Sequence, residues 1–217
     1  MCFSAAASFT ASAIITSMGV VAHKKSKNKT YQLLAYVPII FGIHQFLEGW
    51  VWLSLQNADL AFLNVPVTYA FMLVAWVVWP IYMPFTLWKL EKGPLRRKIL
   101  GTITVLGTLT MFLLVYIITH YGIKSEVLDC SIYYDYGVKH PMGWIVGAMY
   151  VLTTSISTLV SSVKKMWVMG LLNLGAYVFS KLYYNVHIIS VWCFFAALIS
   201  IVILYIIVHL KKEEVAS

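Results

Sequence analysis

A few side chains capable of acid–base chemistry or ion binding lie inside long apolar stretches of the chain. Glu48 is the only acid in the interior of any such stretch, and His44 precedes it by four residues, so both lie on one helical face. Gln45 flanks this pair. Lys181 is the only lysine deep in an apolar stretch, and at about 1.5 Å per residue it lies at the depth of Glu48, roughly 22 Å from the basic loops. Because an unpaired charge in hydrocarbon costs several kcal/mol, the sequence predicts an ion pair between Glu48 and Lys181.

Further polar side chains extend this predicted site along the segment that carries Lys181. Asn173, Tyr177 and Lys181 recur at helical spacing. We therefore predict a polar cavity within the membrane, open to the outer side, that binds a small molecule or an ion in a sensor or transporter-like protein. Its predicted ligand-binding residues are Glu48, Lys181, His44, Gln45, Asn173 and Tyr177.

An enzyme is the second hypothesis. Removal of Met1 would expose Cys2 as an N-terminal thiol, and its own amine would then act as the base. Glu48, His44 or Lys181 would serve as acid–base groups, which makes Cys2 and Glu48 the candidate catalytic residues. A third hypothesis is a structural or assembly partner whose polar residues only fix the packing of helices.

The elements that position these residues are membrane-spanning helices. Of 217 residues, 61% are hydrophobic and only 11% are charged, and the mean hydropathy is +0.82. Such a composition excludes a water-soluble globule, and a helix needs about 20 mostly apolar residues to cross a bilayer. We predict an all-α integral membrane protein, a single domain of residues 1–217. Its seven predicted transmembrane helices are residues 3–22, 31–56, 64–88, 99–121, 143–163, 166–184 and 188–210.

The distribution of basic residues predicts the orientation. If the chain crosses seven times, all but three of its 16 Lys and Arg residues fall on one side, and the exceptions are Lys124, Lys139 and Lys181. Cytoplasmic loops carry the excess of Lys and Arg, so the N-terminus is predicted outside and the C-terminus in the cytoplasm. The net charge of +8 is therefore a topology signal, with the lipid bilayer as partner and no nucleic acid.

Small and hydroxylated residues predict where helices approach closely. Ser4, Ser8 and Ser12 recur every fourth residue of the first predicted helix, and Gly143 and Gly147 form a GxxxG pair at the start of the fifth. In the third predicted helix, Pro80 and Pro84 are expected to cause a bend, because each removes a backbone hydrogen bond.

Several kinds of site are absent from the sequence. It contains no CxxC, GxSxG, HExxH or Walker motif, and the last predicted helix lacks the lysine that a retinal Schiff base requires. We therefore expect no cofactor and no metal. In an oxidising compartment Cys2 and Cys130, both on the predicted outer side, would be able to form a disulfide, with Cys193 left as a buried thiol.

Several short motifs carry a resemblance to a known family. They are the opening Met-Cys-Phe-Ser-Ala, the segment from Phe41 to Trp52, Trp79-Pro80, the segment from Ser131 to Gly137 and the segment from Ser190 to Ala197. Together they resemble a family of small multi-pass, mostly bacterial, membrane proteins known only as a domain of unknown function. The resemblance covers nearly the whole chain and implies a bacterial inner-membrane setting, without an activity or a ligand.

Overall fold

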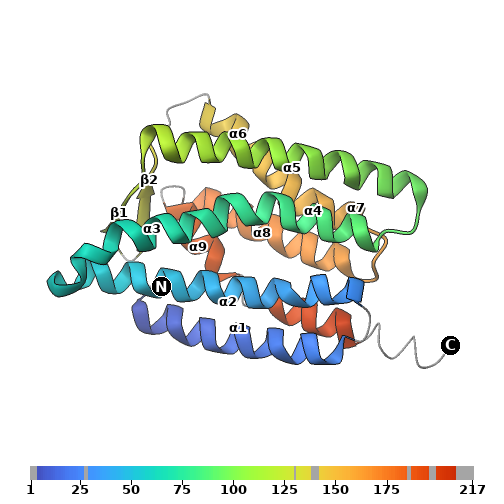
Figure 1. Cartoon of the computed structure of the whole chain (residues 1–217), viewed down its shortest axis with the longest axis horizontal. Helices are drawn as coiled ribbons and strands as arrows, with labels where there is room; N and C mark the ends of the chain where they lie inside the picture. The colour runs from blue at the N-terminus through green and yellow to red at the C-terminus, as the bar shows by residue number, and fades with distance from the viewer. Residues whose placement is uncertain are drawn as a thin grey trace.

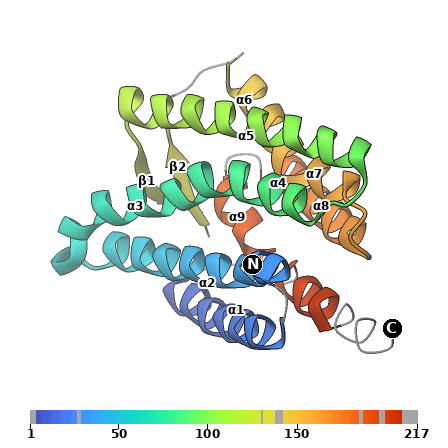
Figure 2. The same cartoon turned by 45° about the vertical axis from the view of Figure 1, so that its right-hand side comes forward.

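The computed structural model describes residues 4–26, 29–129, 131–137, 142–184, 187–195 and 199–208. Helices make up most of this part of the chain, and they run roughly alongside one another (Figures 1 and 2). The elements are α1 (Ala5–Lys25), α2 (Lys29–Gln56), η1 (Ala58–Leu63), α3 (Asn64–Leu73), η2 (Val74–Val78), α4 (Trp79–Leu90), α5 (Pro94–Tyr121), β1 (Lys124–Leu128), β2 (Ser131–Asp135), α6 (Met142–Val151), η3 (Leu152–Ile156), α7 (Ser157–Val160), α8 (Met166–Tyr183), α9 (Ile188–Phe194) and a final helix, Ile199–Val208.

Five helical segments of the described chain are long and apolar enough to cross a membrane. They are Ala5–Lys25, Tyr31–Gln56, Ala58–Leu90, Pro94–Tyr121 and Gly143–Val160, and they correspond to the first five predicted spans. The predicted sixth span corresponds to α8. The predicted seventh is described as two pieces, α9 and Ile199–Val208, that point in different directions in Figure 2. The long apolar helices indicate an integral membrane protein with several spans.

The first two helices pack through the hydroxylated face predicted from the sequence. Ser8 and Ser12 are buried, and the Ser12 hydroxyl donates a hydrogen bond to the Gly42 carbonyl oxygen at 2.7 Å. A side chain at Gly42 would overlap Thr16, which shows how closely α1 and α2 approach. This contact agrees with the tendency of small residues to mediate helix packing in lipid.

The predicted GxxxG pair does not mediate such a contact. A Cβ atom added at Gly143 would meet no atom within 4 Å, and one at Gly147 would meet only the Tyr177 hydroxyl at 3.9 Å. A close approach between α4 and α5 occurs instead at Gly107, where an added Cβ would lie 2.0 Å from the Pro80 carbonyl oxygen.

The third span changes its helical winding immediately before Pro80. Val74–Val78 forms a π-helical turn between α3 and α4, and a second π-helical turn, η3, interrupts the span between α6 and α7. Pro80 has no N–H to donate to the preceding turn, so the regular series of α-helical backbone hydrogen bonds is interrupted there. The carbonyl oxygen of Ala75, in the first turn, accepts a hydrogen bond from the Tyr150 hydroxyl at 2.7 Å.

An antiparallel hairpin of β1 and β2 lies at one end of the bundle, which we call the hairpin end (Figure 1). Its residues fall between the fourth and fifth predicted helices, 99–121 and 143–163. Ile132 and Tyr134 of β2 are buried, and the Tyr134 ring stacks on Phe71 of α3. Ser125 of β1 accepts a hydrogen bond from Asn64 at 3.0 Å. The hairpin is therefore part of the packed structure.

The opposite end of the bundle, the basic end, carries the connections from α4 to α5 and from α7 to α8. The Glu91 carboxylate joins them by accepting hydrogen bonds from the Ser162 N–H at 2.8 Å and the Ser162 hydroxyl at 2.7 Å. A third comes from the Gly93 N–H. Burial by itself would raise the pKa of Glu91, but these bonds and the charge of Arg96 hold the pKa below its ordinary value of 4.5.

Candidate functional site

A cavity of about 180 Å³ lies between the two hydrophobic cores of the bundle. Trp76 and Leu114 belong to the core nearer the hairpin, Trp79 and Met169 to the other, and all four line the cavity. Both π-helical turns contribute to its walls, through Ala75 and Thr154. Its aromatic lining residues are Phe41, Trp76, Trp79, Tyr136, Tyr150, Tyr177 and Trp192.

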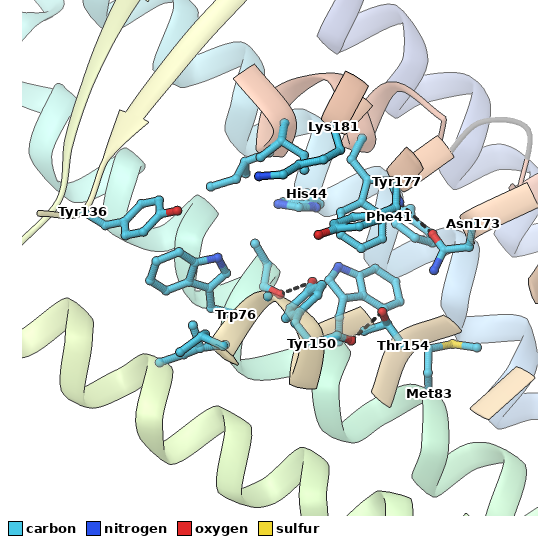
Figure 3. A pocket seen from close by; sticks show the side chains of 18 of the residues that line it. Phe41, His44, Trp76, Met83, Tyr136, Tyr150, Thr154, Asn173, Tyr177 and Lys181 are labelled. Carbon is cyan, nitrogen blue, oxygen red and sulfur yellow. Dashed lines mark hydrogen bonds between the residues drawn. The ribbon is translucent and has the colours of Figure 1, made fainter. Parts of the chain in front are cut away.

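Three polar side chains from two separate parts of the chain direct their ends into the same part of this cavity. Figure 3 shows the Lys181 ammonium and the Tyr177 hydroxyl from α8 facing the Tyr136 hydroxyl, which comes from the segment that follows β2. The indole of Trp76, in η2, lies below them. In the described part of the chain, none of these four polar groups has a hydrogen-bond partner.

The chemistry of these groups is that of hydrogen-bond donors. The Lys181 ammonium lies 4.5 Å from the centroid of the Trp144 ring, a cation–π contact that leaves its N–H groups without an acceptor. Burial, and then the neighbouring Tyr133 and Asp135, raises the pKa of Tyr136, so its phenol keeps its proton at neutral pH. None of the described lining residues is Asp or Glu.

A further unpaired donor lies in the cavity wall. Trp79 is 5% exposed, and its indole N–H has no acceptor among the described residues. A buried donor without a partner costs about 1–3 kcal/mol. The indole nitrogen itself is inaccessible, so this donor is not available to a molecule in the cavity.

Asn173 also lines the cavity, and both the nitrogen and the oxygen of its amide hold protein partners. Its Nδ2 donates to the Ser155 hydroxyl and its Oδ1 accepts from the Trp192 indole N–H, each at 2.8 Å. Asn173 therefore connects α8 to η3 and α9 and fixes the position of Trp192. Its contribution to the site is to position the aromatic wall.

The predicted ion pair between Glu48 and Lys181 is absent from the described structure. Glu48 is 3% exposed, and its carboxyl oxygens accept hydrogen bonds from the Ser190 hydroxyl at 2.6 Å and from Gln45 Nε2 at 3.0 Å. Neither Glu48 nor Gln45 lines the cavity. The prediction is wrong because equal depth in the membrane does not place two side chains on facing sides of their helices.

His44 is the predicted residue of α2 that does reach the cavity. Its ring stacks on Phe71 with a centroid separation of 4.2 Å, and Phe71 in turn stacks on Tyr134 of the hairpin. Of the six predicted ligand-binding residues, the four that line this cavity are His44, Asn173, Tyr177 and Lys181, and their role in binding stays a prediction. The aromatic residues of η2, α6 and α9 and the hairpin-derived Tyr136 were missed, because nothing in the sequence separates them from ordinary apolar core.

The thiol chemistry proposed from the sequence falls outside what the structure describes. Cys2 and Cys130 lie outside the described residues, and of Cys193 only the backbone is described, within α9. The enzyme hypothesis and the disulfide therefore stay predictions. No group of three or more His, Cys, Asp or Glu side chains within the described ranges is arranged to hold a metal ion.

The five long apolar helices of the described chain indicate the class, an α-helical integral membrane protein with several spans. The chain belongs to Family of unknown function (DUF6629), which matches residues 1–217 and confirms the resemblance seen in its motifs. Comparison with curated proteins and with solved structures finds no match.

Proposed function

We propose that this protein binds a small molecule in the cavity between its two cores, as a sensor or a transporter-like protein does. The observation that carries the proposal is the cavity of about 180 Å³, whose mostly apolar wall includes three donors without acceptors among the described residues, Lys181, Tyr177 and Tyr136. An apolar cavity of about 150 Å³ is large enough to hold benzene, so this one is large enough for a single ring with one substituent.

The arrangement of the walls supports binding over a purely structural role. A protein that needs only stable packing is expected to fill its core, since empty space forfeits dispersion contacts. Here the large aromatic side chains surround the space instead of filling it. Ligand sites of this type combine apolar walls with a small number of polar groups that orient the ligand.

The proposal includes the orientation predicted from the charges. The chain crosses the membrane seven times, with the N-terminus outside and the basic end in the cytoplasm of a bacterial cell. Lys89, Lys92, Arg96 and Lys98 lie in or next to the connection between α4 and α5, in agreement with the excess of basic residues expected on the cytoplasmic side. The hairpin end then faces outward, and we propose that the cavity opens on that side. A reporter fused to the C-terminus is expected to be active only in the cytoplasm.

Binding can be tested by filling the cavity. Gly147 lines it and has space around its Cα, so Gly147→Leu is expected to fold and to occupy part of the volume. Gly175 of α8 has equally open surroundings but lies outside the cavity, and Gly175→Leu is the matched control. Titration calorimetry of the purified protein in detergent, with benzyl alcohol as probe, is expected to show saturable binding to the wild type and the control that is lost in Gly147→Leu. Equal heats for all three proteins would refute the proposal.

A further inference from the structure

We infer that the ligand of this cavity is a small monocarboxylate with an apolar, ring-sized body, bound through Lys181, Tyr177 and Tyr136. This inference rests on the proposed binding function and adds the chemical class of the ligand. Its basis is the convergence of one cation and two phenols in the same part of an otherwise apolar cavity (Figure 3).

The charge of the site favours an anion. Lys181 contributes a positive charge to the lining, and no described lining residue carries a carboxylate to balance it. Glu48, the only acid in the interior of a span, is engaged with Ser190 and Gln45 instead. A cationic ligand would bring a second positive charge next to Lys181, and like charges at short range oppose binding.

The number of charges favours a carboxylate over a phosphate group. The site offers one ammonium and neutral donors, which match the single negative charge and two acceptor oxygens of a carboxylate. A phosphate group carries close to two charges at neutral pH and would remain partly uncompensated. Two tyrosine hydroxyls and an ammonium supply donors for both carboxylate oxygens.

The rest of the cavity determines the body of the ligand. Beyond the donors, the wall is formed by side chains such as Trp76, Leu114, Val146 and Met169, which offer an apolar surface. A volume of about 180 Å³ accommodates one ring carrying one carboxylate and excludes long acyl chains. Trp76 and Tyr177 come from separate elements, so a flat ring is able to contact aromatic surface on more than one side.

The test compares three probes of one size and different charge: benzoate, benzyl alcohol and benzylamine. Titration calorimetry at neutral pH is expected to show that the wild type binds benzoate at least 10-fold more tightly than the other two. Loss of a charge-assisted bond in Lys181→Met is expected to lower the benzoate affinity about 10-fold to 100-fold. The affinity for benzyl alcohol is expected to change less than about 3-fold, because it does not require the charge.

Matched controls separate the site from general effects on the protein. Lys124, an exposed residue of β1, gives the control Lys124→Met, which removes the same charge outside the cavity. Tyr177→Phe is expected to weaken benzoate binding about 3-fold to 10-fold, whereas Tyr183→Phe, at a residue that is 72% exposed on the same helix, leaves it unchanged. Lys181→Arg keeps the charge and is expected to retain benzoate binding. It is the second variant to be measured where Lys181→Met does not fold.

The outcomes distinguish this inference from the proposed function. If the wild type binds benzyl alcohol or benzylamine as tightly as benzoate, and Gly147→Leu abolishes that binding, the cavity binds ligands but the inferred carboxylate class is wrong. If none of the three probes binds, both the inference and the proposed function are overturned. Since the probe comparison uses the wild type alone, it decides the ligand class even where a variant is unstable.

Discussion

The hydrogen bond between Ser190 and Glu48 connects α9 to α2, two elements far apart in the sequence, and its removal gives a sharp test of how the bundle is held together. The donor and acceptor are 1% and 3% exposed, and the oxygen–oxygen distance is 2.6 Å. Ser190→Ala leaves one carboxyl oxygen of Glu48 without its donor, and the second oxygen keeps its bond from Gln45.

The expected loss follows from the burial of this pair. An unsatisfied buried acceptor costs about 1–3 kcal/mol, and side-chain hydrogen bonds between helices in membranes contribute about 0.6 kcal/mol on average and up to about 1.7. Because the bond is short and nearly inaccessible, we expect Ser190→Ala to lower the free energy of unfolding by about 1.5 kcal/mol. For a chain of this length that corresponds to a fall in Tm of roughly 3–6 °C.

The assay is unfolding of the purified protein in mixed micelles with increasing SDS, followed by circular dichroism. Ser17→Ala is the matched control, since Ser17 is exposed and its hydroxyl bonds only to Ala13 within α1. It is expected to change the free energy of unfolding by less than about 0.5 kcal/mol.

A double-mutant cycle isolates the pair itself. Glu48→Leu removes the acceptor, so Ser190→Ala in that background is expected to cost at least 1 kcal/mol less than in the wild type, as found for side chains in direct contact. Losses that add to within about 0.3–0.5 kcal/mol would show that the two side chains do not interact, and would refute this reasoning.

Three further predictions follow from other contacts. Glu91→Gln replaces a carboxylate oxygen with an amide that faces a donor, so it should lower the free energy of unfolding by about 1–3 kcal/mol at pH 7. Because the pKa of Glu91 is lowered on folding, this stabilisation is present above pH 4.5 and is lost as the pH falls through the folded value; a constant difference between variant and wild type down to low pH would contradict it. Glu48→Gln and Lys181→Met should have additive effects on thermal stability in detergent, since no ion pair joins these two described residues. If the double variant were more stable than the sum of the two losses predicts, the ion pair would be supported after all. Gly107→Ala forces a Cβ against a backbone oxygen and should cost about 2–3 kcal/mol in the same unfolding assay, whereas Gly175→Ala should be tolerated, and equal effects would argue against the close approach of α4 and α5.

The class of this protein follows from the sequence alone. The hydrocarbon core of a bilayer accepts long apolar segments whose backbone N–H and C=O groups are hydrogen-bonded within the segment, as in a helix. The apolar stretches therefore predict the first five helices close to where the structure has them. The hydroxylated face of α1 was also recognisable, because small residues at a spacing of four lie on one side of a helix. His44, Asn173, Tyr177 and Lys181 stood out for a similar reason, since polar groups are rare at such depth.

Only the tertiary structure decided which of these groups meet. Depth along a helix is readable from the sequence, but the rotation of each helix about its axis depends on the packing of all its neighbours. Glu48 therefore faces Ser190, and Lys181 faces the cavity, although both were predicted at one depth. Tyr136 reaches the cavity because the hairpin folds onto the end of the bundle through the burial of Ile132 and Tyr134. Contacts of this kind join residues distant in the chain, and they depend on side-chain shape and helix rotation, which no local pattern of residue types specifies.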